Sequence, residues 1–264
     1  MNQALSDAVS RDLLPGIRST QLWAMLGWDD IRQRYRRSVL GPFWITLSMG
    51  VFILLLGVIY ARLFKVDIAT YLPFLSVGYI LWGFISQTTS EAGRAFQEGE
   101  RIIKQIKLPY TIYVMRVVWR NFIVFLHTIV IFIPVAIIFD VRPGFISLLA
   151  LPGLALVYLN QLWVTLVLAI LGTRYRDLNP IVVTAVQIML FATPILWPVS
   201  ALSGATIIAD INPLYHLIEI VRAPMLGAAP HALSWTVAIG MAIAGSMLAI
   251  ALLARASRRL VFWL

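Results

Sequence analysis

Basic side chains are concentrated in one short segment near the N-terminus of this 264-residue chain. Residues 28–41 read WDDIRQRYRRSVLG, which on a helix gives an apolar face with aromatic side chains and a broad charged face. Such a helix lies at a membrane surface, with Asp29 and Asp30 in its first turn, where the helix dipole favours carboxylates. Arginine binds phosphate bidentately, so the segment is either a headgroup-binding site or a plain anchor attracted to anionic lipid. The candidate headgroup residues are Arg32, Arg34, Tyr35, Arg36 and Arg37.

A second charged stretch, residues 91–109, reads EAGRAFQEGERIIKQIKLP and lies between two apolar runs. Glu100 and Lys104 are four residues apart, in the order that stabilises a helix. Glu98 and Arg101 are three residues apart and form a second possible pair. The stretch is either a solvated loop or a docking surface for another protein, and its length favours the docking surface.

The chain carries no recognisable catalytic or nucleotide-binding motif. It has no Gly-Lys dipeptide, so it lacks the G-x-x-x-x-G-K-[ST] loop that cradles a nucleotide, and it has no G-x-S-x-G or H-E-x-x-H sequence. It contains no cysteine, and His127, His216 and His231 are far apart, so we expect no metal site. Asp and Glu, which a proton- or sodium-coupled transporter usually uses as relay or ligand groups, are absent from the apolar runs. We therefore expect no enzyme activity and no cofactor in this chain, and a driving force for transport must come from another subunit.

The composition requires an integral membrane protein. Hydrophobic residues make up 60% of the chain and charged residues 12%, and the mean hydropathy is +0.86. These values exclude a disordered chain, a coiled coil and an ordinary soluble enzyme. The net charge of +9 is explained by basic loops on the cytoplasmic side of a membrane, so we expect no nucleic-acid partner.

Six apolar segments predict an all-α protein with six transmembrane helices, because only helices or closed barrels satisfy the backbone in lipid. The predicted spans are residues 43–60, 71–90, 117–139, 145–171, 181–197 and 235–254. The fifth is the shortest and contains Pro194.

The distribution of basic residues predicts the orientation. Seventeen of the 21 Lys and Arg residues fall on the side that holds both termini, which is therefore the cytoplasmic side. The expected location is the cell inner membrane, with multiple spans. The chain then divides into a cytoplasmic N-terminal segment (1–42), a transmembrane domain (43–254) and a cytoplasmic tail (255–264).

Residues 198–234 form the last external loop and are too many for a simple turn. Asn212 followed by Pro213 predicts the start of a helix. Pro224 should end it after about ten residues, too few to span a bilayer. We expect short re-entrant or interfacial helices here, forming an external gate.

Three blocks of sequence resemble a known family. They are DIRQRYRRSVLGPFWITL (30–47), EGERIIKQIKLP (98–109), and RYRDLNPIVVTAVQIMLFATPILWP (174–198) with INPLYHLIEIVRAP (211–224). The chain resembles, from about residue 28 to its end, the permease subunits of ABC transporters that export polysaccharides, including O-antigen, capsule and teichoic acid. The basic helix followed by R-R-S-x-L-G is fairly specific for that family.

The resemblance implies a homodimer that binds two ATPase subunits, which hold ATP and Mg²⁺, and membrane lipids around it. It implies an ATPase-coupling role for Glu98, Glu100, Arg101 and Lys104. The implied substrate is a lipid-linked polysaccharide, with O-antigen as the leading candidate, threaded through a channel partly lined by aromatic side chains. The aromatic channel-lining candidates are Phe43, Trp44, Phe52, Tyr60, Phe191 and Trp197.

Arg116 and Arg120 are added to the channel candidates because they share one face of the third predicted span with His127. The alternative is that both arginines extend to the cytoplasmic interface while the histidine is hydrogen-bonded in a helix contact.

Two other functions remain open from sequence. The first is an ABC permease for small drugs or lipids, which the R-R-S-x-L-G block disfavours. The second is a polyprenyl- or sugar-transferring membrane enzyme, but Glu91, Asp140 and Asp177 form no evident catalytic cluster.

Overall fold

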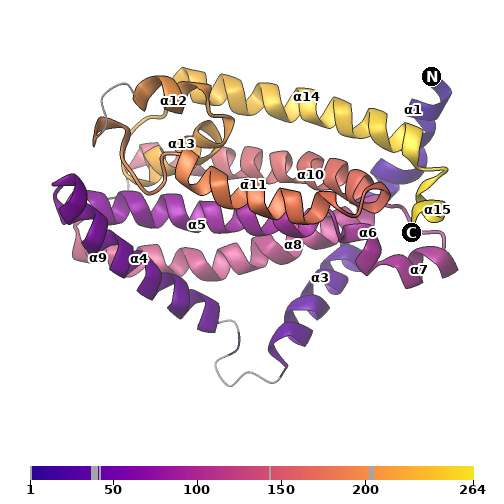
Figure 1. Ribbon diagram of the computed structural model, residues 1–264, viewed down its shortest axis with the longest axis horizontal. Coiled ribbons are helices and arrows are strands. Elements are labelled where there is room, and N and C mark those ends of the chain that lie inside the picture. The colour runs from indigo at the N-terminus through magenta and orange to yellow at the C-terminus, as the bar shows by residue number, and fades with distance from the viewer. Residues whose placement is uncertain (1, 37–40, 42, 143, 202–204) are drawn as a thin grey trace.

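The computed structural model describes residues 2–36, 41, 43–142, 144–201 and 205–264 (Figure 1). Every regular element in this part of the chain is a helix, which confirms the predicted all-α class. Arg37, one of the headgroup candidates, lies outside the described residues.

Five helical stretches are long and apolar enough to cross a bilayer, by length and composition, within the described ranges. They are α4 (Phe43–Phe64); α5 (Ile68–Ala92); α8 (Thr111–Thr128) with η2 (Ile129–Ile131) and α9 (Phe132–Ile138); η3 (Phe145–Leu149) with α10 (Ala150–Arg174); and α14 (Ala232–Ala256). Each corresponds to one of the predicted spans.

The remaining predicted span, the fifth in chain order, forms a shorter helix, α11 (Leu178–Ala192). Its 15 residues extend about 22 Å at ~1.5 Å per residue, whereas the bilayer core is ~30 Å thick. The helix ends because Thr193, which precedes Pro194, has extended backbone with φ −97° and ψ 138°. The predicted count of six spanning helices is therefore not confirmed.

Residues 193–197 continue α11 as irregular chain, and the carbonyl groups at its start are hydrogen-bonded. Asn212 Nδ2 donates to the Ala192 carbonyl at 3.2 Å, and Arg222 Nη1 donates to the Pro194 carbonyl at 2.8 Å. The Tyr71 hydroxyl donates to the Leu196 carbonyl. Irregular backbone at membrane depth is stable only where protein groups satisfy it in this way.

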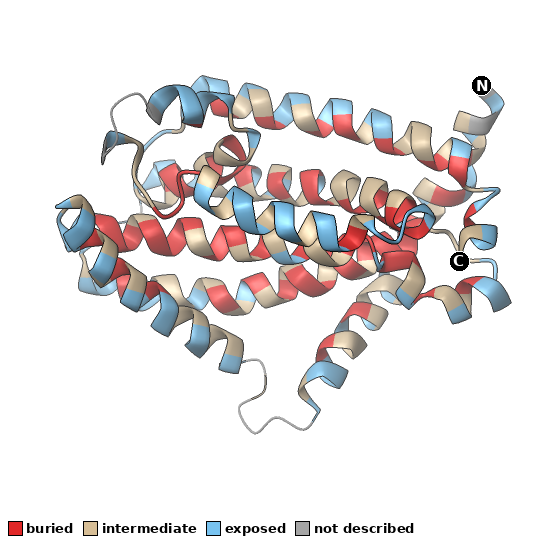
Figure 2. Ribbon diagram, viewed as in Figure 1, coloured by how far each residue is buried: buried red, intermediate tan, exposed pale blue. Residues whose placement is uncertain are grey.

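Helix α5 lies at the centre of the bundle, with α4, α8, α10, α11 and α13 packed against it. Leu75, Val77 and Ile80 of α5 are completely buried, and Figure 2 shows buried residues along most of this helix. In the 18-residue apolar stretch of α5 that could cross a membrane, 67% is buried, whereas the corresponding share in α4 is 11%. Helix α4 therefore presents a long apolar face that nothing in this chain covers within the described residues.

The N-terminal segment folds onto the bundle as α1 (Asn2–Ala8), η1 (Val9–Leu13) and α2 (Leu14–Arg18). Asp12 is buried, and its carboxylate accepts hydrogen bonds from the backbone N–H groups of Tyr110 (2.7 Å) and Thr111 (3.0 Å). It also accepts from the Thr111 hydroxyl at 2.7 Å. Asp12 thus satisfies the free donors at the start of α8, as an N-cap residue would.

The amphipathic helix predicted over residues 28–41 begins earlier and ends sooner: α3 is Thr20–Tyr35. No proline interrupts it, and Gly27 fits because α3 lies so close to α8 that an added Cβ would be 3.2 Å from the α8 backbone. Asp29 and Asp30 therefore lie in the second half of the helix. Their predicted placement in the first turn is wrong.

The last loop contains η4 (Val199–Ala201), α12 (Ala205–Ile211) and α13 (Pro213–Met225). The predicted start of α13 is confirmed: Asn212 Oδ1 accepts hydrogen bonds from the backbone N–H groups of Leu214 and Tyr215, and Pro213 occupies the first turn. Most of α13 is buried against α5, α10 and α14, so it packs inside the bundle.

The sequence predicted that α13 would end before Pro224. The helix instead continues one residue beyond this proline. A proline in the last turn leaves the Ile220 carbonyl, four residues earlier, without its helical donor. That carbonyl faces Gly153 of α10, where an added Cβ would lie only 2.5 Å from the oxygen. Gly153 therefore allows α10 to pack closely against the end of α13.

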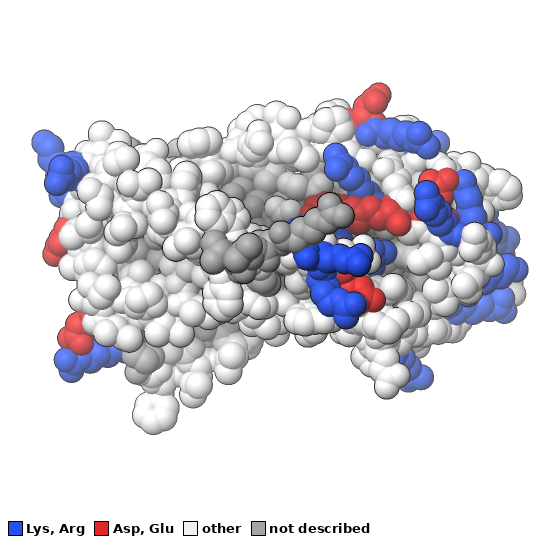
Figure 3. Space-filling model, turned by 90° about the horizontal axis from the view of Figure 1, so that it is seen from below, with Lys and Arg blue, Asp and Glu red and all other residues white. Residues whose placement is uncertain are grey.

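Both chain termini lie at the end of the molecule that carries α6 (Ala95–Glu98), α7 (Glu100–Gln105) and α15 (Leu260–Trp263) (Figure 1). Lys and Arg side chains gather at this end, and fewer lie at the opposite end near α9 (Figure 3). The charged stretch 91–109 begins in the last turn of α5 and contains two short helices, α6 and α7.

Candidate functional site

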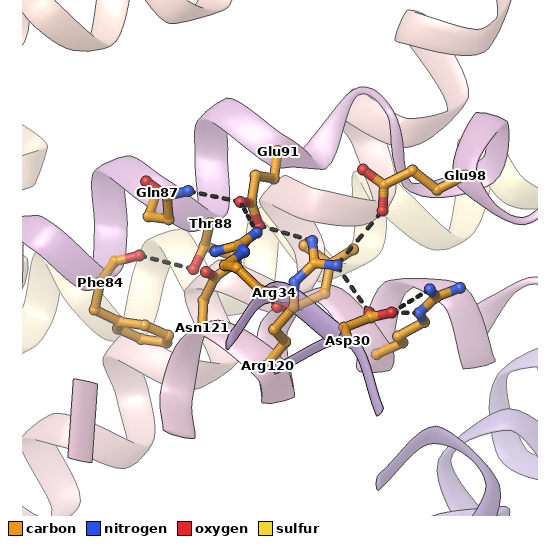
Figure 4. Close-up of polar contacts among 11 residues, drawn as sticks. Asp30, Arg34, Phe84, Gln87, Thr88, Glu91, Glu98, Arg120 and Asn121 are labelled. Carbon is orange, nitrogen blue, oxygen red and sulfur yellow. Dashed lines mark hydrogen bonds and ion pairs between the residues drawn. The ribbon is translucent and has the colours of Figure 1, made fainter. Parts of the chain in front are cut away.

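Charged side chains from four helices meet near the end of the bundle that carries α6 (Figure 4). Asp30 and Arg34 come from α3, Glu91 from the last turn of α5, Glu98 from α6, and Arg116 and Arg120 from α8. We call these six residues the arginine–carboxylate network. It contains three arginines and three carboxylates, so its formal charges balance.

Arg120 is the centre of the network. Its side chain is 5% exposed, and Nη1 donates to Asp30 Oδ2 at 2.8 Å while Nη2 donates to Glu91 Oε2 at 2.7 Å. Glu98 Oε2 lies 3.5 Å from Nη1. A single buried guanidinium thus holds α3, α5 and α6 to α8.

Asp30 joins both arginines of α8. Arg116 Nε donates to Asp30 Oδ2 at 2.7 Å, and Arg116 Nη2 donates to Oδ1 in a bidentate arrangement. Charge-assisted, bidentate pairs of this kind fix orientation as well as adding stability. Nearby, the Trp23 and Trp119 rings meet edge to face at 5.5 Å, which strengthens the contact between α3 and α8.

Glu91 accepts hydrogen bonds from four side chains. Besides Arg120, the donors are Arg34 Nη2 at 3.0 Å, Asn121 Nδ2 at 2.9 Å and Gln87 Nε2 at 2.6 Å. A buried carboxylate loses its hydration, and several donors are needed to offset that cost. Glu91 is therefore held in place from three helices.

The coupling candidates divide between the network and the exposed surface of α7. Lys104 Nζ donates to Glu100 Oε1 at 2.6 Å, which confirms the predicted pair, and this contact lowers the pKa of Glu100 below its usual value. The predicted pairing of Glu98 with Arg101 is wrong: Arg101 is exposed and Glu98 faces Arg120. The reason is a bend at Gly99 between α6 and α7.

Gly99 is required at that bend because the ring of Tyr113 lies against it. A Cβ added at Gly99 would be 2.4 Å from the ring. This contact turns α7 away from α6 and leaves Glu98 pointing to α8.

The headgroup candidates occupy the end of α3. Arg32 and Arg36 are exposed, while Arg34 binds Glu91 and remains 40% exposed. The Tyr35 hydroxyl has no partner among the described residues, and burial of the side chain raises its pKa. Arg34 also borders a cavity of about 180 Å³ that reaches apolar side chains of α4, α5 and α8, including Met49.

The aromatic channel candidates on α4 are largely exposed: Phe43, Trp44 and Phe52 are 71%, 56% and 43% exposed. Tyr60 is half-buried and stacks on Phe64 at 5.7 Å. Their role in lining a channel stays a prediction.

The two candidates from the fifth segment are joined to each other. Phe191 is 64% exposed on α11, and the half-buried Trp197 donates its Nε1 hydrogen to the Phe191 carbonyl at 2.9 Å. These two residues therefore flank the irregular end of the segment.

Arg116 and Arg120 both lie in the arginine–carboxylate network, where their guanidinium groups are bound to carboxylates. His127 is separate from them, with Nδ1 2.7 Å from the Ile123 carbonyl of its own helix. No group of three or more metal-ligating side chains occurs among the described residues.

Sequence reasoning missed the pairing of Asp30 and Glu91 with α8. Their partners are 29 to 90 residues away, and no local spacing signals such contacts. Asn121, which donates to the same Glu91 oxygen as Arg120, was missed for the same reason.

A second buried arginine lies at the opposite end of the bundle. Arg222 of α13 is 2% exposed, and its Nε and Nη2 donate to Glu219 Oε2 at 3.0 and 2.7 Å. Its guanidinium lies 4.0 Å from the centre of the Phe74 ring, and Nη1 donates to the Pro194 carbonyl. This arginine stabilises the irregular end of the fifth apolar segment.

Residues 20–226 match the family described as ABC-2 type transporter. The chain is 24% identical over 198 residues to the O-antigen export system permease protein RfbA of Myxococcus xanthus, covering 74% of this chain and 76% of that protein. Two Klebsiella pneumoniae proteins of the same name are 26% and 25% identical over 172 residues, covering 64% of this chain and 65% of each relative.

Proposed function

The chain belongs to the ABC-2 type transporter family, and from this membership we propose that it is the membrane-spanning permease of an ATP-driven polysaccharide exporter. The relatives named O-antigen export permeases support a lipid-linked O-antigen as the substrate. With several membrane-length helices, the chain is a multi-pass membrane protein.

The arginine–carboxylate network is the observation that carries the proposed mechanism. A partner ATPase docks on the exposed surface of α6 and α7, using Glu98, Glu100, Arg101 and Lys104. Glu98 contacts Arg120, which also holds Asp30 of α3 and Glu91 of α5. A displacement of α6 is therefore transmitted by ion pairs to three other helices. ATP and Mg²⁺ belong to the partner, and this chain performs no catalysis and binds no cofactor.

The assembly that we propose contains two copies of this chain and two ATPase subunits in the inner membrane. The uncovered apolar face of α4 and the exposed residues of α11, including Ile181, Ile188 and Phe191, support contact with a second copy or a channel between copies. The concentration of basic residues at the α6 end supports a cytoplasmic location for both termini.

Deletion of the gene in the source cells tests the substrate. We expect lipid-linked polysaccharide to accumulate on the inner face of the membrane, and export to return when the wild-type gene is restored. Normal surface polysaccharide with increased sensitivity to small toxic compounds would favour an exporter of drugs or lipids instead.

The orientation is tested with single cysteines, because the natural chain has none. In spheroplasts, Ala228→Cys should react with a membrane-impermeant maleimide and Gln105→Cys should react only after permeabilisation. The opposite pattern would reverse the orientation and remove α7 from the reach of a cytoplasmic ATPase.

A further inference from the structure

A cavity of about 620 Å³ lies at the end of the molecule opposite α6 and α7. It is bordered by η4, α12, α13 and the start of α14. Its size falls in the range of small-molecule sites, ~300–1,000 Å³. The arginine–carboxylate network lies at the other end, so this cavity is separate from the coupling machinery.

One wall of the cavity is fixed by a buried histidine. His216 is 1% exposed; Nε2 is 2.9 Å from the Asp210 backbone carbonyl, and Nδ1 is 3.0 Å from Ser234 Oγ. A carbonyl only accepts, so Nε2 carries the hydrogen, and in the neutral ring Nδ1 accepts from the Ser234 hydroxyl. His216 thereby ties α12, α13 and α14 together, and the wall is preorganised.

The rest of the lining combines hydrogen-bonding groups with an aromatic ring. Ser200 and Thr206 contribute hydroxyls, Asp210 a carboxylate, His231 an imidazole and Tyr215 a phenol. Each of these groups can accept a hydrogen bond, and all except the carboxylate can also donate one. This mixture matches a ligand that carries many hydroxyls.

The charge of the cavity lining distinguishes an anionic ligand from a neutral one. The lining residues described include no lysine or arginine, and Asp210 is the acidic one. An anionic phosphate would meet the Asp210 carboxylate without a compensating cation, so a phosphate headgroup is disfavoured. A neutral sugar avoids that repulsion, because hydroxyls donate to the carboxylate and the apolar C–H face of the ring packs on Tyr215.

We propose that this cavity binds a sugar unit of the exported polysaccharide as the chain leaves the transporter. The inference rests on the proposed function, because it takes polysaccharide as the substrate. Asp210 and His231, both exposed, bind the sugar hydroxyls. The wall fixed by His216 places Tyr215 against the apolar face of the sugar ring. Binding of successive units at the exit disfavours backward sliding of the chain.

The direct test measures sugar binding to the permease–ATPase complex in nanodiscs by saturation-transfer NMR. The probe is the polysaccharide of the source strain, released from its lipid by mild acid. We expect sugar signals with the wild type and a roughly tenfold weaker affinity in the Asp210→Asn/His231→Ala double variant, the effect of losing a hydrogen bond to a charged group. Asp140→Asn is the matched control, because it removes a carboxylate outside the cavity, and it should bind as the wild type does.

Equal sugar binding by the double variant and the wild type would overturn the proposal. A signal from glycerophosphoethanolamine that the double variant loses, with no such change for the polysaccharide, would assign the cavity to a lipid headgroup and also overturn it. Failure of the proposed function is seen separately, as normal polysaccharide export in the deletion strain.

Discussion

Two buried arginines at opposite ends of the bundle are held in different ways. Arg120 is paired with carboxylates from three other helices, α3, α5 and α6. Arg222 is paired with Glu219 on its own helix and donates to one backbone carbonyl, with its guanidinium over an aromatic ring. The first arginine joins separate elements, whereas the second satisfies one stretch of irregular chain.

The difference shows how the two ends respond to a change. Removing one partner of a buried ion pair leaves the remaining charges without compensation, which costs more than the intact pair contributes. Around Arg120 those charges belong to several helices, so their release loosens the whole α6 end. Around Arg222 the groups that lose a hydrogen-bond donor belong to α13 and residues 193–197.

The largest effect is expected for Arg120→Met, which leaves Asp30 and Glu91 without their shared cation. We expect a loss of roughly 3–5 kcal/mol of stability and faster proteolysis of α3, measured on purified permease. Arg32→Met is the matched control, because Arg32 is exposed on the same helix as Asp30. An unchanged melting temperature for Arg120→Met would contradict a central role for this residue.

Neutralising the carboxylates sharpens that result. In the triple variant Arg120→Met/Asp30→Asn/Glu91→Gln, the two carboxylates that lose Arg120 are neutral. Arg116 and Arg34 lose their own partners, but their side chains are 16% and 40% exposed and can be hydrated. Stability should recover in part, while coupling of ATP hydrolysis to export stays lost. A triple variant less stable than Arg120→Met alone would show that these charges are not the source of the damage.

Arg222→Met should have a smaller and more local effect. It leaves Glu219 without its cation, but this carboxylate is 18% exposed and lies on the same helix. It also leaves the Pro194 carbonyl without its donor, at a cost of about 1–3 kcal/mol. Hydrogen exchange should accelerate in residues 193–197 and remain unchanged in α3. Accelerated exchange at both ends would show that the two arginines belong to one cooperative unit.

Asn212→Ala removes the N-cap of α13 and should cost about 1 kcal/mol. Asn212→Asp separates the two roles of the side chain, because it keeps the acceptor for Leu214 and loses the donor to the Ala192 carbonyl. Exchange at Leu214 should increase only in the Ala variant. An equal increase in both variants would contradict the capping role.

The smallest effect on stability is expected at Glu100. Lys104 lowers the pKa of Glu100, so the pair is formed above the ordinary carboxyl pKa and is lost only as the pH falls through the lowered value. At pH 7 the carboxylate is fully charged but exposed, and Glu100→Gln should leave the melting temperature unchanged. The measurement that should change is ATP-driven export by the complex. Unchanged export would move the docking role elsewhere on α6 and α7.

Long apolar runs made five of the membrane-length helices predictable, and the Asn212–Pro213 pair predicted the start of α13. The ion pairs of the network were not predictable. Asp30 and Arg120, for example, are separated by 90 residues and meet only through packing of α3 on α8. The bend at Gly99 was also hidden, since it depends on the Tyr113 ring rather than on neighbouring residues.

The contacts of Asp12 determine the order in which the chain can assemble. This carboxylate binds the backbone of Tyr110 and Thr111, which are synthesised nearly one hundred residues later. At ~5–20 residues per second, the N-terminal segment waits several seconds on the ribosome before its docking site exists. During that interval its first helices have no bundle to pack against, so packing of the N-terminal segment depends on membrane insertion of the later helices.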